Sequence, residues 1–300
     1  MKKWLFIPIV IILVIVLDLS NRIFCNYVIK HCPENTDMFY RCIYQLNTHQ
    51  SDILITGASR ASHHYNPYIF EDSLLCSAYN AGYDGMNINF SYLTIKRAIN
   101  NGPVKIVLLD LSAPQITDEY SYSLQNHKPY YWENSDVREY FDQIKPWSEK
   151  IFMCSSFYQF NSKLFNNFRC LLTKPKPETK GYNPLPCSDK VIDSTFKIHD
   201  SDIAISDISL SQLNKISTLC KNKGIRLILI LSPALVYNPK VACCLEKYAI
   251  ENDVIFWNFN NYEPIVTNNS LFKDAGHMNS KGADIYTKVL VSKIKEAQLL

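Results

Sequence analysis

Three residues whose types suit nucleophilic catalysis stand near opposite ends of the sequence. Ser59 follows Gly57 directly after a short apolar run, and Asp274 and His277 lie three positions apart near the other end. A serine hydroxyl becomes a nucleophile when an imidazole accepts its proton and an aspartate holds that imidazole in the correct tautomer. Asp274 and His277 can share one face of a turn. We therefore predict a Ser59–His277–Asp274 catalytic triad.

Parts of this pattern also have purely structural interpretations. The segment from Asp274 to His277 can be the turn that enters a final helix, with Asn279 or Ser280 as the N-cap of that helix. His63 and His64 follow the serine closely and suggest a metal pair or a second base, although such histidines more often satisfy polar groups on a helix. The order of these residues along the chain favours the catalytic interpretation, and no metal site is expected.

The segments that must position these residues alternate between strand and helix patterns. Runs rich in β-branched and apolar residues predict strands at 52–57, 77–80, 104–110, 226–231 and 254–257. Helices are predicted over 88–101, 209–223, 239–251 and 280–297. This alternation predicts an α/β fold, a three-layer α/β/α sandwich with a mainly parallel five-stranded sheet. Ligands of such sheets bind beyond the carboxyl ends of the strands, which is where Ser59 stands.

The stretch from about 113 to 206 breaks the alternation. It contains helical pieces near 135–170 and then a proline-rich, lysine-rich segment. We predict that it is a helical insertion within one domain, 51–300, rather than a second domain. The preceding residues 26–50 are predicted to contain a juxtamembrane helix, because 37–48 space their apolar groups like an amphipathic helix.

The N-terminus has the pattern of a membrane anchor. Lys2 and Lys3 precede an uncharged run from Trp4 to Leu17. At about 1.5 Å per residue, this run spans about 21 Å, short of a hydrocarbon core of about 30 Å unless the helix continues. A cleaved signal peptide and a buried core helix are alternatives, but no small-residue cleavage site follows, so we favour an uncleaved anchor over 1–25. The positive-inside rule leaves the two lysines in the cytoplasm and the domain outside.

Composition narrows the partners and cofactors. A chain of 300 residues that is 47% hydrophobic can form one large core. Its net charge is only +3, from 31 basic and 28 acidic residues, so nucleic acid is not an expected partner. The ten cysteines include no CxxC pair and no Cys/His spacing suited to zinc, and neither metal nor cofactor is expected. Cys25, Cys32 and Cys42 either form disulfides in an oxidising compartment or are free thiols.

The early Gly57-Ala58-Ser59 and the late Asp274-x-x-His277 resemble the first and last sequence blocks of the SGNH/GDSL hydrolase superfamily. The resemblance covers residues 52–110 and 225–297. It implies Ser59 as the nucleophile, His277 as the base and Asp274 as the third member of the triad. Alanine, Ala58, stands where the first block often has aspartate.

The same resemblance implies an oxyanion hole and substrate contacts. One donor is the backbone amide of Ser59, and a second comes from a glycine in the block that begins at Asn80, with Gly85 favoured and Gly82 as the alternate. Arg60 and Asn80 are the candidate substrate contacts, Arg60 because its charge suits a carboxylate or an acidic sugar, although an ordinary surface or salt-bridge role is favoured for Arg60. The third block of the family normally reads Gly-x-Asn-Asp, and this chain has Asp110-Leu111-Ser112 there.

Two functions follow as hypotheses. The Gly-x-Ser-Arg first block and the N-terminal anchor look like envelope-facing SGNH-like proteins of bacteria, which implies a single-pass protein of the inner membrane with its catalytic domain in the periplasm. The first hypothesis is a serine esterase or O-acyltransferase that acts on acylated, mainly O-acetylated, cell-envelope carbohydrate. The second, motivated by the third block, is a catalytically inactive SGNH-like module that binds polysaccharide or scaffolds an envelope assembly.

Overall fold

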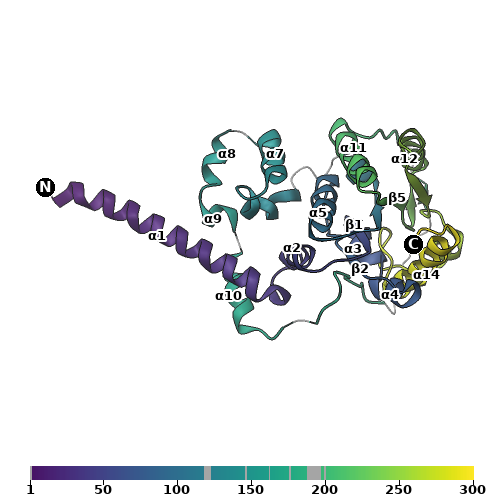
Figure 1. Ribbon diagram of the computed structural model, residues 1–300, viewed down its shortest axis with the longest axis horizontal. Coiled ribbons are helices and arrows are strands. Elements are labelled where there is room, and N and C mark those ends of the chain that lie inside the picture. Colours follow the sequence, from purple (N-terminus) through teal and green to yellow (C-terminus); the bar gives the residue numbers. More distant parts are fainter. Residues whose placement is uncertain are drawn as a thin grey trace. The chain divides into compact units, whose positions relative to one another are not determined.

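The computed structural model describes residues 2–117, 123–145, 147–161, 163–175, 177–187, 197–198 and 201–300. The chain divides into two compact units (Figure 1). The first, called here the anchor unit, comprises Met1–Tyr44 and Leu124–Glu178. The second, called the sheet unit, comprises Gln45–Ser123 and Thr179–Leu300.

Five parallel strands form the centre of the sheet unit. Their spatial order is β2 (Ala78–Asn80), β1 (Ile53–Gly57), β3 (Ile106–Asp110), β5 (Arg226–Leu231) and β7 (Ile255–Asn258). All four neighbouring pairs are parallel. Every residue of β1 and β3 is buried, as expected when helices cover both faces of a parallel sheet. The α/β prediction is confirmed, and each predicted strand lies at its expected place.

Helices pack on this sheet and bury its apolar side chains. They are α3 (Ser59–His64), α4 (Pro67–Leu74), α5 (Ile88–Asn101), α11 (Asp207–Asn222), α12 (Pro239–Asn252) and α14 (Ser280–Glu296). Helix α5 packs against α11, and α14 packs against α3 and α4. On the α14 side, Ile55 and Leu108 of the sheet share one core with Tyr286 and Leu290. Each such burial stabilises the fold by about 1.5–3 kcal/mol.

Shorter elements complete the sheet unit. They are α6 (Ala113–Ile116), α13 (Glu263–Val266), η3 (Asn269–Leu271) and a parallel pair of two-residue strands, β4 (Lys197–Ile198) and β6 (Val236–Tyr237). The sequence pattern did not predict the β4–β6 pair, because two residues are too short to show a strand period.

The predicted insertion is divided between the two units. Residues 124–178 form one compact body with the N-terminal segment, whereas 179–206 belong to the sheet unit. Parts of the insertion, 118–122, 188–196 and 199–200, lie outside the described residues. This division differs from the predicted boundaries at 25 and 50, because two helices of the insertion, within 156–172, pack on the N-terminal helix. The helices and turn are η2 (Ser123–Tyr130), α7 (Ser135–Ile144), α8 (Trp147–Phe152), α9 (Ser156–Gln159) and α10 (Leu164–Leu172).

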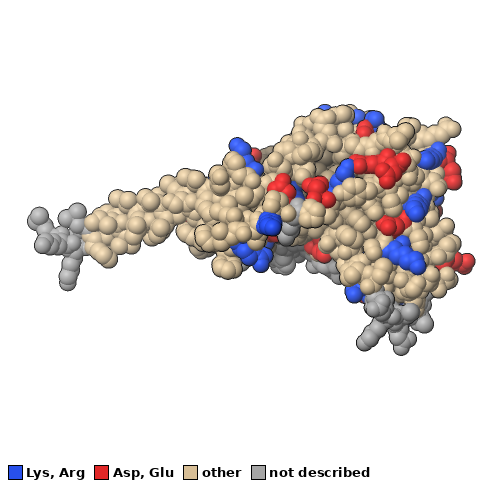
Figure 2. All heavy atoms as spheres, turned by 90° about the horizontal axis from the view of Figure 1, so that it is seen from below, with Lys and Arg blue, Asp and Glu red and all other residues tan. Residues whose placement is uncertain are grey.

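The N-terminal segment is one long helix, α1 (Lys2–His31), followed by η1 (Pro33–Asn35) and α2 (Met38–Thr48). Its portion Phe6–His31 is long and apolar enough to cross a membrane. A signal sequence near the N-terminus can have the same length and composition. Within the anchor unit, α9 and α10 pack only on the C-terminal half of α1, and the N-terminal half extends beyond them (Figure 1). Figure 2 shows this extending half without charged atoms up to its undescribed tip. The helix is compatible with a membrane anchor.

All ten cysteines are free thiols in the structure. Cys25, Cys42, Cys170 and Cys220 are buried. Of the two interpretations that the sequence allowed, the structure therefore shows free thiols.

Candidate active site

The turn between β1 and α3 presents Ser59 at the carboxyl end of the sheet. Gly57 ends β1 with φ of +147°, and a Cβ atom there would lie 2.4 Å from the carbonyl oxygen of Asp110. Only glycine fits this close approach, and it lets the chain turn at once into α3, whose first residue is Ser59. β1 lies between β2 and β3, where the strand order reverses. Ligands bind at this switch point in open α/β sheets.

A short turn holds Asp274 and His277 together. The Asp274 Oδ1 atom accepts hydrogen bonds from the backbone amides of Gly276, at 2.8 Å, and His277, at 2.9 Å. The His277 Nδ1 atom lies 2.9 Å from Asp274 Oδ1 and 3.0 Å from Oδ2. Because a carboxylate only accepts hydrogen bonds, Nδ1 has to be the protonated nitrogen of a neutral His277.

The structure brings Ser59 and His277 together. The Ser59 Oγ atom lies 2.7 Å from His277 Nε2, although the residues are 218 positions apart in the sequence. With Nδ1 protonated, Nε2 is free to accept the serine proton, the arrangement that nucleophilic catalysis by serine requires. The Asp274 side chain is 56% exposed, so water also reaches this carboxylate.

A second histidine, His64, supports the loop that contains the base. It is completely buried, and its Nε2 atom accepts a hydrogen bond of 3.0 Å from the backbone amide of Met278. Its Nδ1 atom must then donate the 2.9 Å bond to Ser232 Oγ. Burial holds the pKa of His64 well below its usual value, and the charge of Arg60 acts in the same direction. His64 is therefore a neutral structural residue.

His63 lies beside the base and has two accepting partners. Its Nδ1 atom is 2.6 Å from the carbonyl oxygen of Asn183, and its Nε2 atom is 3.3 Å from Asp84 Oδ1. Burial alone would lower the pKa of His63, but the hydrogen bonds to Asp84 and Asn183 outweigh it and the pKa is raised. The centres of the His63 and His277 rings are 5.5 Å apart. The arrangement suits an imidazolium that donates on both sides, a feature that the sequence did not predict because Asn183 lies in the insertion.

The two glycines predicted for the oxyanion hole differ in their surroundings. The amide of Gly82 donates to Asn80 Oδ1 at 2.9 Å, so this N–H already has an acceptor. Gly85 lies in an exposed turn with φ of +70° and remains the second predicted donor. The amide of Ser59 opens α3, and the first amides of a helix have no carbonyl partner within it.

Asn80 and Arg60 were both predicted to contact the substrate. Asn80 is completely buried, and both N–H groups of its amide donate within the fold, to the carbonyl oxygens of Ala61 at 2.7 Å and Tyr65 at 3.0 Å. These bonds favour a structural role, linking β2 to α3, over the predicted substrate contact. Arg60 is half-buried directly after Ser59, where a substrate contact stays a prediction.

Asp110, in the third block, ends β3 beside Gly57 and is buried. Its side chain is 1% exposed, and Oδ2 accepts a 2.5 Å hydrogen bond from the Tyr65 hydroxyl. Burial raises the pKa of Asp110 to about 6, although the charge of Arg60 and hydrogen bonds from Ser232 and Tyr65 oppose this rise. The carboxyl group of Asp110 is therefore buried and hydrogen-bonded within the core.

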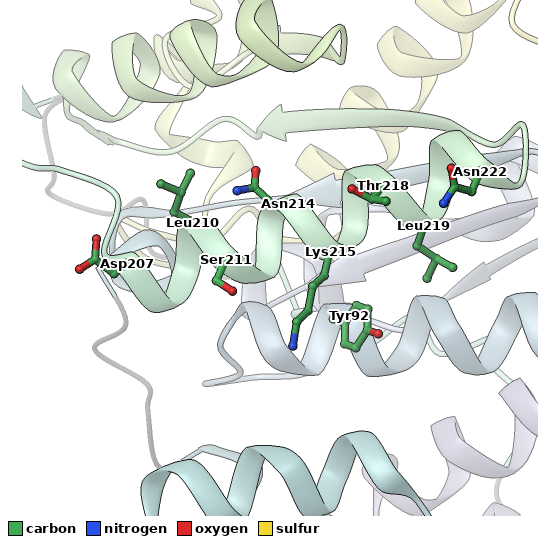
Figure 3. Close-up of a pocket in the computed structure, with 9 residues that line it drawn as sticks. All are labelled: Tyr92, Asp207, Leu210, Ser211, Asn214, Lys215, Thr218, Leu219 and Asn222. Atoms are coloured by element: carbon green, nitrogen blue, oxygen red, sulfur yellow. The ribbon is translucent and has the colours of Figure 1, made fainter.

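A hollow of about 670 Å³ lies away from these residues, on the outer side of α5 and α11 (Figure 3). It is lined by Tyr92 of α5 and by residues of α11 such as Asn214 and Lys215. None of the triad residues lines it. Across the described ranges, no three His, Cys, Asp or Glu side chains gather in a way that could hold a metal ion.

Comparison with known proteins adds a likeness in structure. The sequence matches no family model and no curated protein. A GDSL-like lipase from Bacteroides thetaiotaomicron has a TM-score of 0.41 and 14% identity, covering 82% of this chain and 88% of its own. A proposed acylhydrolase from Bacteroides fragilis has a TM-score of 0.42 and 13% identity, covering 83% and 88%. A proposed lipolytic protein of the G-D-S-L family from Desulfitobacterium hafniense has a TM-score of 0.42 and 9% identity. The match covers 80% of this chain and 98% of that protein.

All three TM-scores are below 0.5 and all three identities are 14% or less, so the chemistry of the site has to be derived from its own residues. The chain has a five-stranded parallel α/β/α fold, and the solved structures that it resembles are GDSL-like lipases and proposed acylhydrolases.

Proposed function

We propose that this chain is a membrane-anchored serine esterase or O-acyltransferase that acts on acylated cell-envelope carbohydrate through Ser59, His277 and Asp274. The observation that supports it most directly is the hydrogen-bonded series from Ser59 Oγ through His277 to Asp274. The resemblance of the Ser59 and Asp274–His277 segments to SGNH hydrolase blocks points to the same roles.

The geometry suits a two-step acyl transfer. Ser59 Oγ attacks the ester carbonyl carbon while His277 Nε2 accepts the serine proton. The bond to the leaving alcohol then breaks, and His277 returns that proton to the alcohol oxygen, which leaves an acyl group on Ser59. Water or a glycan hydroxyl attacks this ester with His277 again as base, and Ser59 recovers its proton. The amides of Ser59 and Gly85 are the proposed donors to the oxyanion.

The proposed substrate is an envelope glycan, and the proposed location is the inner membrane. An O-acetylated envelope glycan and a periplasmic domain on the inner membrane are inferred from the resemblance to envelope-facing bacterial proteins and from α1. The alternative function is a catalytically inactive module that binds polysaccharide or scaffolds an envelope assembly. It is favoured by the absence of the third-block asparagine and by the occupied amide of Gly82.

Fluorophosphonate labelling of the full chain in detergent tests the proposal. We expect one adduct at Ser59, located by mass spectrometry, that is absent from Ser59→Ala and from His277→Ala. Ser292→Ala, which removes an exposed serine of α14, is the matched control and should label like the unmodified chain. Folded protein without an adduct, together with no acyl release from acetylated glycans, would favour the binding-module alternative.

A further inference from the structure

Helix α10 of the anchor unit exposes five large apolar side chains. Leu164, Phe165, Phe168, Leu171 and Leu172 are all exposed, Phe165 to 81% and Leu172 to 75%. Asn167 and Cys170, on the opposite face, are buried. The exposed residues follow the spacing of one helix face. Exposure to water forgoes about 1.5–3 kcal/mol for each large apolar side chain, so this face calls for an apolar partner.

The two helices that precede α10 in the anchor unit also expose apolar side chains. Helix α8 buries none of its residues, and its Trp147, Ile151 and Phe152 are exposed, Trp147 to 75%. Phe157 of α9 is also exposed. The name apolar collar is used here for the exposed apolar side chains of α8, α9 and α10. Soluble proteins rarely expose so many large apolar groups on adjacent elements, and such patches mark protein or membrane contacts.

Polar bonds attach the N-terminus of α9 to α1. The Asp18 carboxylate accepts hydrogen bonds from Ser155 Oγ, at 2.7 Å, and from the amide of Ser156, at 3.0 Å. One turn further, the Asn21 amide donates to Ser156 Oγ at 2.9 Å. The N-terminus of α9 is thus attached to α1 at Asp18 and Asn21, directly after the uncharged run, which ends at Leu17.

The length of the uncharged run explains why apolar groups are needed at that level. Its span of about 21 Å falls about 9 Å short of a hydrocarbon core of about 30 Å. Leu19 and Ile23 are exposed on one side of the next turns of α1, whereas α9 and α10 cover the other side. The apolar collar supplies lipid-facing surface on the side that these helices cover, while the charge of Asp18 is satisfied within the protein.

We infer that the apolar collar is a membrane-docking surface whose partner is the boundary between acyl chains and headgroups of the bilayer that α1 enters. Tryptophan and phenylalanine side chains are suited to this boundary. The inference rests on the membrane anchoring in the proposed function. Continuity with α1 favours lipid over a second copy of the chain as the occupant.

Lipid quenching of tryptophan fluorescence in the full chain tests this inference. The chain is placed in nanodiscs whose acyl chains are brominated near the headgroup. The fluorescence of Trp147 is the difference between the unmodified chain and Trp147→Phe. We expect bromination to reduce this component about twofold. Trp257→Phe is the control, since Trp257 is buried in the sheet unit and should contribute nothing that bromine quenches. Adding Phe165→Trp to Trp147→Phe should restore quenching from α10.

Other outcomes overturn the inference in distinguishable ways. If the quenched fluorescence is lost in Trp4→Phe, while Trp147 and the tryptophan of Phe165→Trp are not quenched, then α1 enters the membrane and the collar lies outside it. Nanodiscs with two chains and an unquenched Trp147 assign the collar to a second copy. If no tryptophan is quenched, the membrane anchoring itself is wrong, while the triad at Ser59 is untouched by that result.

Discussion

The Nε2 atom of His64 accepts a hydrogen bond of 3.0 Å from the backbone amide of Met278, and this bond joins the helix that begins at Ser59 to the loop that contains His277. His64 ends α3, which begins at Ser59, and Met278 directly follows His277. The other ring nitrogen reaches Ser232, just beyond β5. One buried imidazole therefore links three segments around the Ser59–His277 contact.

Replacing this imidazole should lower stability and disturb the site. His64→Phe leaves the Met278 amide and the Ser232 hydroxyl without their buried partner, and we expect a loss of about 2–4 kcal/mol in the free energy of unfolding. Denaturant titration measures this loss. His64→Gln, which keeps an acceptor and a donor, should lose less. Equal stability of His64→Phe and the unmodified chain would show that these bonds contribute nothing.

Asp274→Asn should reduce activity without removing the turn. The asparagine oxygen can still accept from the Gly276 and His277 amides, but it no longer provides a charge for the imidazolium. Because Asp274 is 56% exposed and water can substitute in part, we expect a drop in kcat/KM of about 10²-fold, below the about 10⁴-fold seen for a buried triad aspartate. Ester hydrolysis measures it. A drop in kcat/KM as large as that caused by Ser59→Ala would show that water cannot substitute for the Asp274 carboxylate.

Asp110→Asn should change how stability depends on pH. The pKa of Asp110 is raised from 3.8 to about 6, so the folded state binds more protons than the unfolded state between these values. Stability from this group is therefore present below about pH 4 and is lost as pH rises through about 6. Asn does not titrate, so the variant lacks this loss. As pH rises from about 4 to about 6, the free energy of unfolding of the variant minus that of the unmodified chain should increase by about 3 kcal/mol. A constant difference across that range would show that Asp110 ionises normally.

Asp84→Asn should weaken the fold only while His63 is protonated. The pKa of His63 is raised above 6.5 by its partners, so its bond to Asp84 stabilises the folded state below that value and fades as pH rises through the folded pKa. The destabilisation by Asp84→Asn should be clear at about pH 6 and absent at about pH 9. Thermal unfolding of both proteins at the two pH values measures it, with Asp72→Asn on the exposed surface as control. Equal destabilisation at both values would indicate a neutral His63.

The strands and helices of the sheet unit could be predicted because each is long enough to show its period. β5 and α14, for example, stand within a residue or two of the expected ranges. Ser59, Asp274 and His277 could be brought together from sequence because two of them share one turn and the serine follows a strand.

The rest depends on contacts that no local pattern shows. His63 pairs with the backbone of Asn183, which is 120 positions away, and His64 with Ser232, 168 positions away. The sequence did not indicate the division of the insertion, because its boundary follows the packing of α9 and α10 on α1. The apolar face of α10 has the same sequence period whether it faces a core or a membrane.

The turn that joins Asp274 to His277 has a consequence for the order of events during synthesis. Its bonds are all local, so base and orienting carboxylate can assemble as soon as these few residues leave the ribosome. Ser59 emerges 218 residues earlier than His277 and has no imidazole to accept its proton until His277 has been made. Since domains fold as units during translation, a nascent chain with α3 already formed cannot be acylated through this site. Nucleophilic reactivity at Ser59 would thus report that the turn of Asp274 and His277 has docked beside α3.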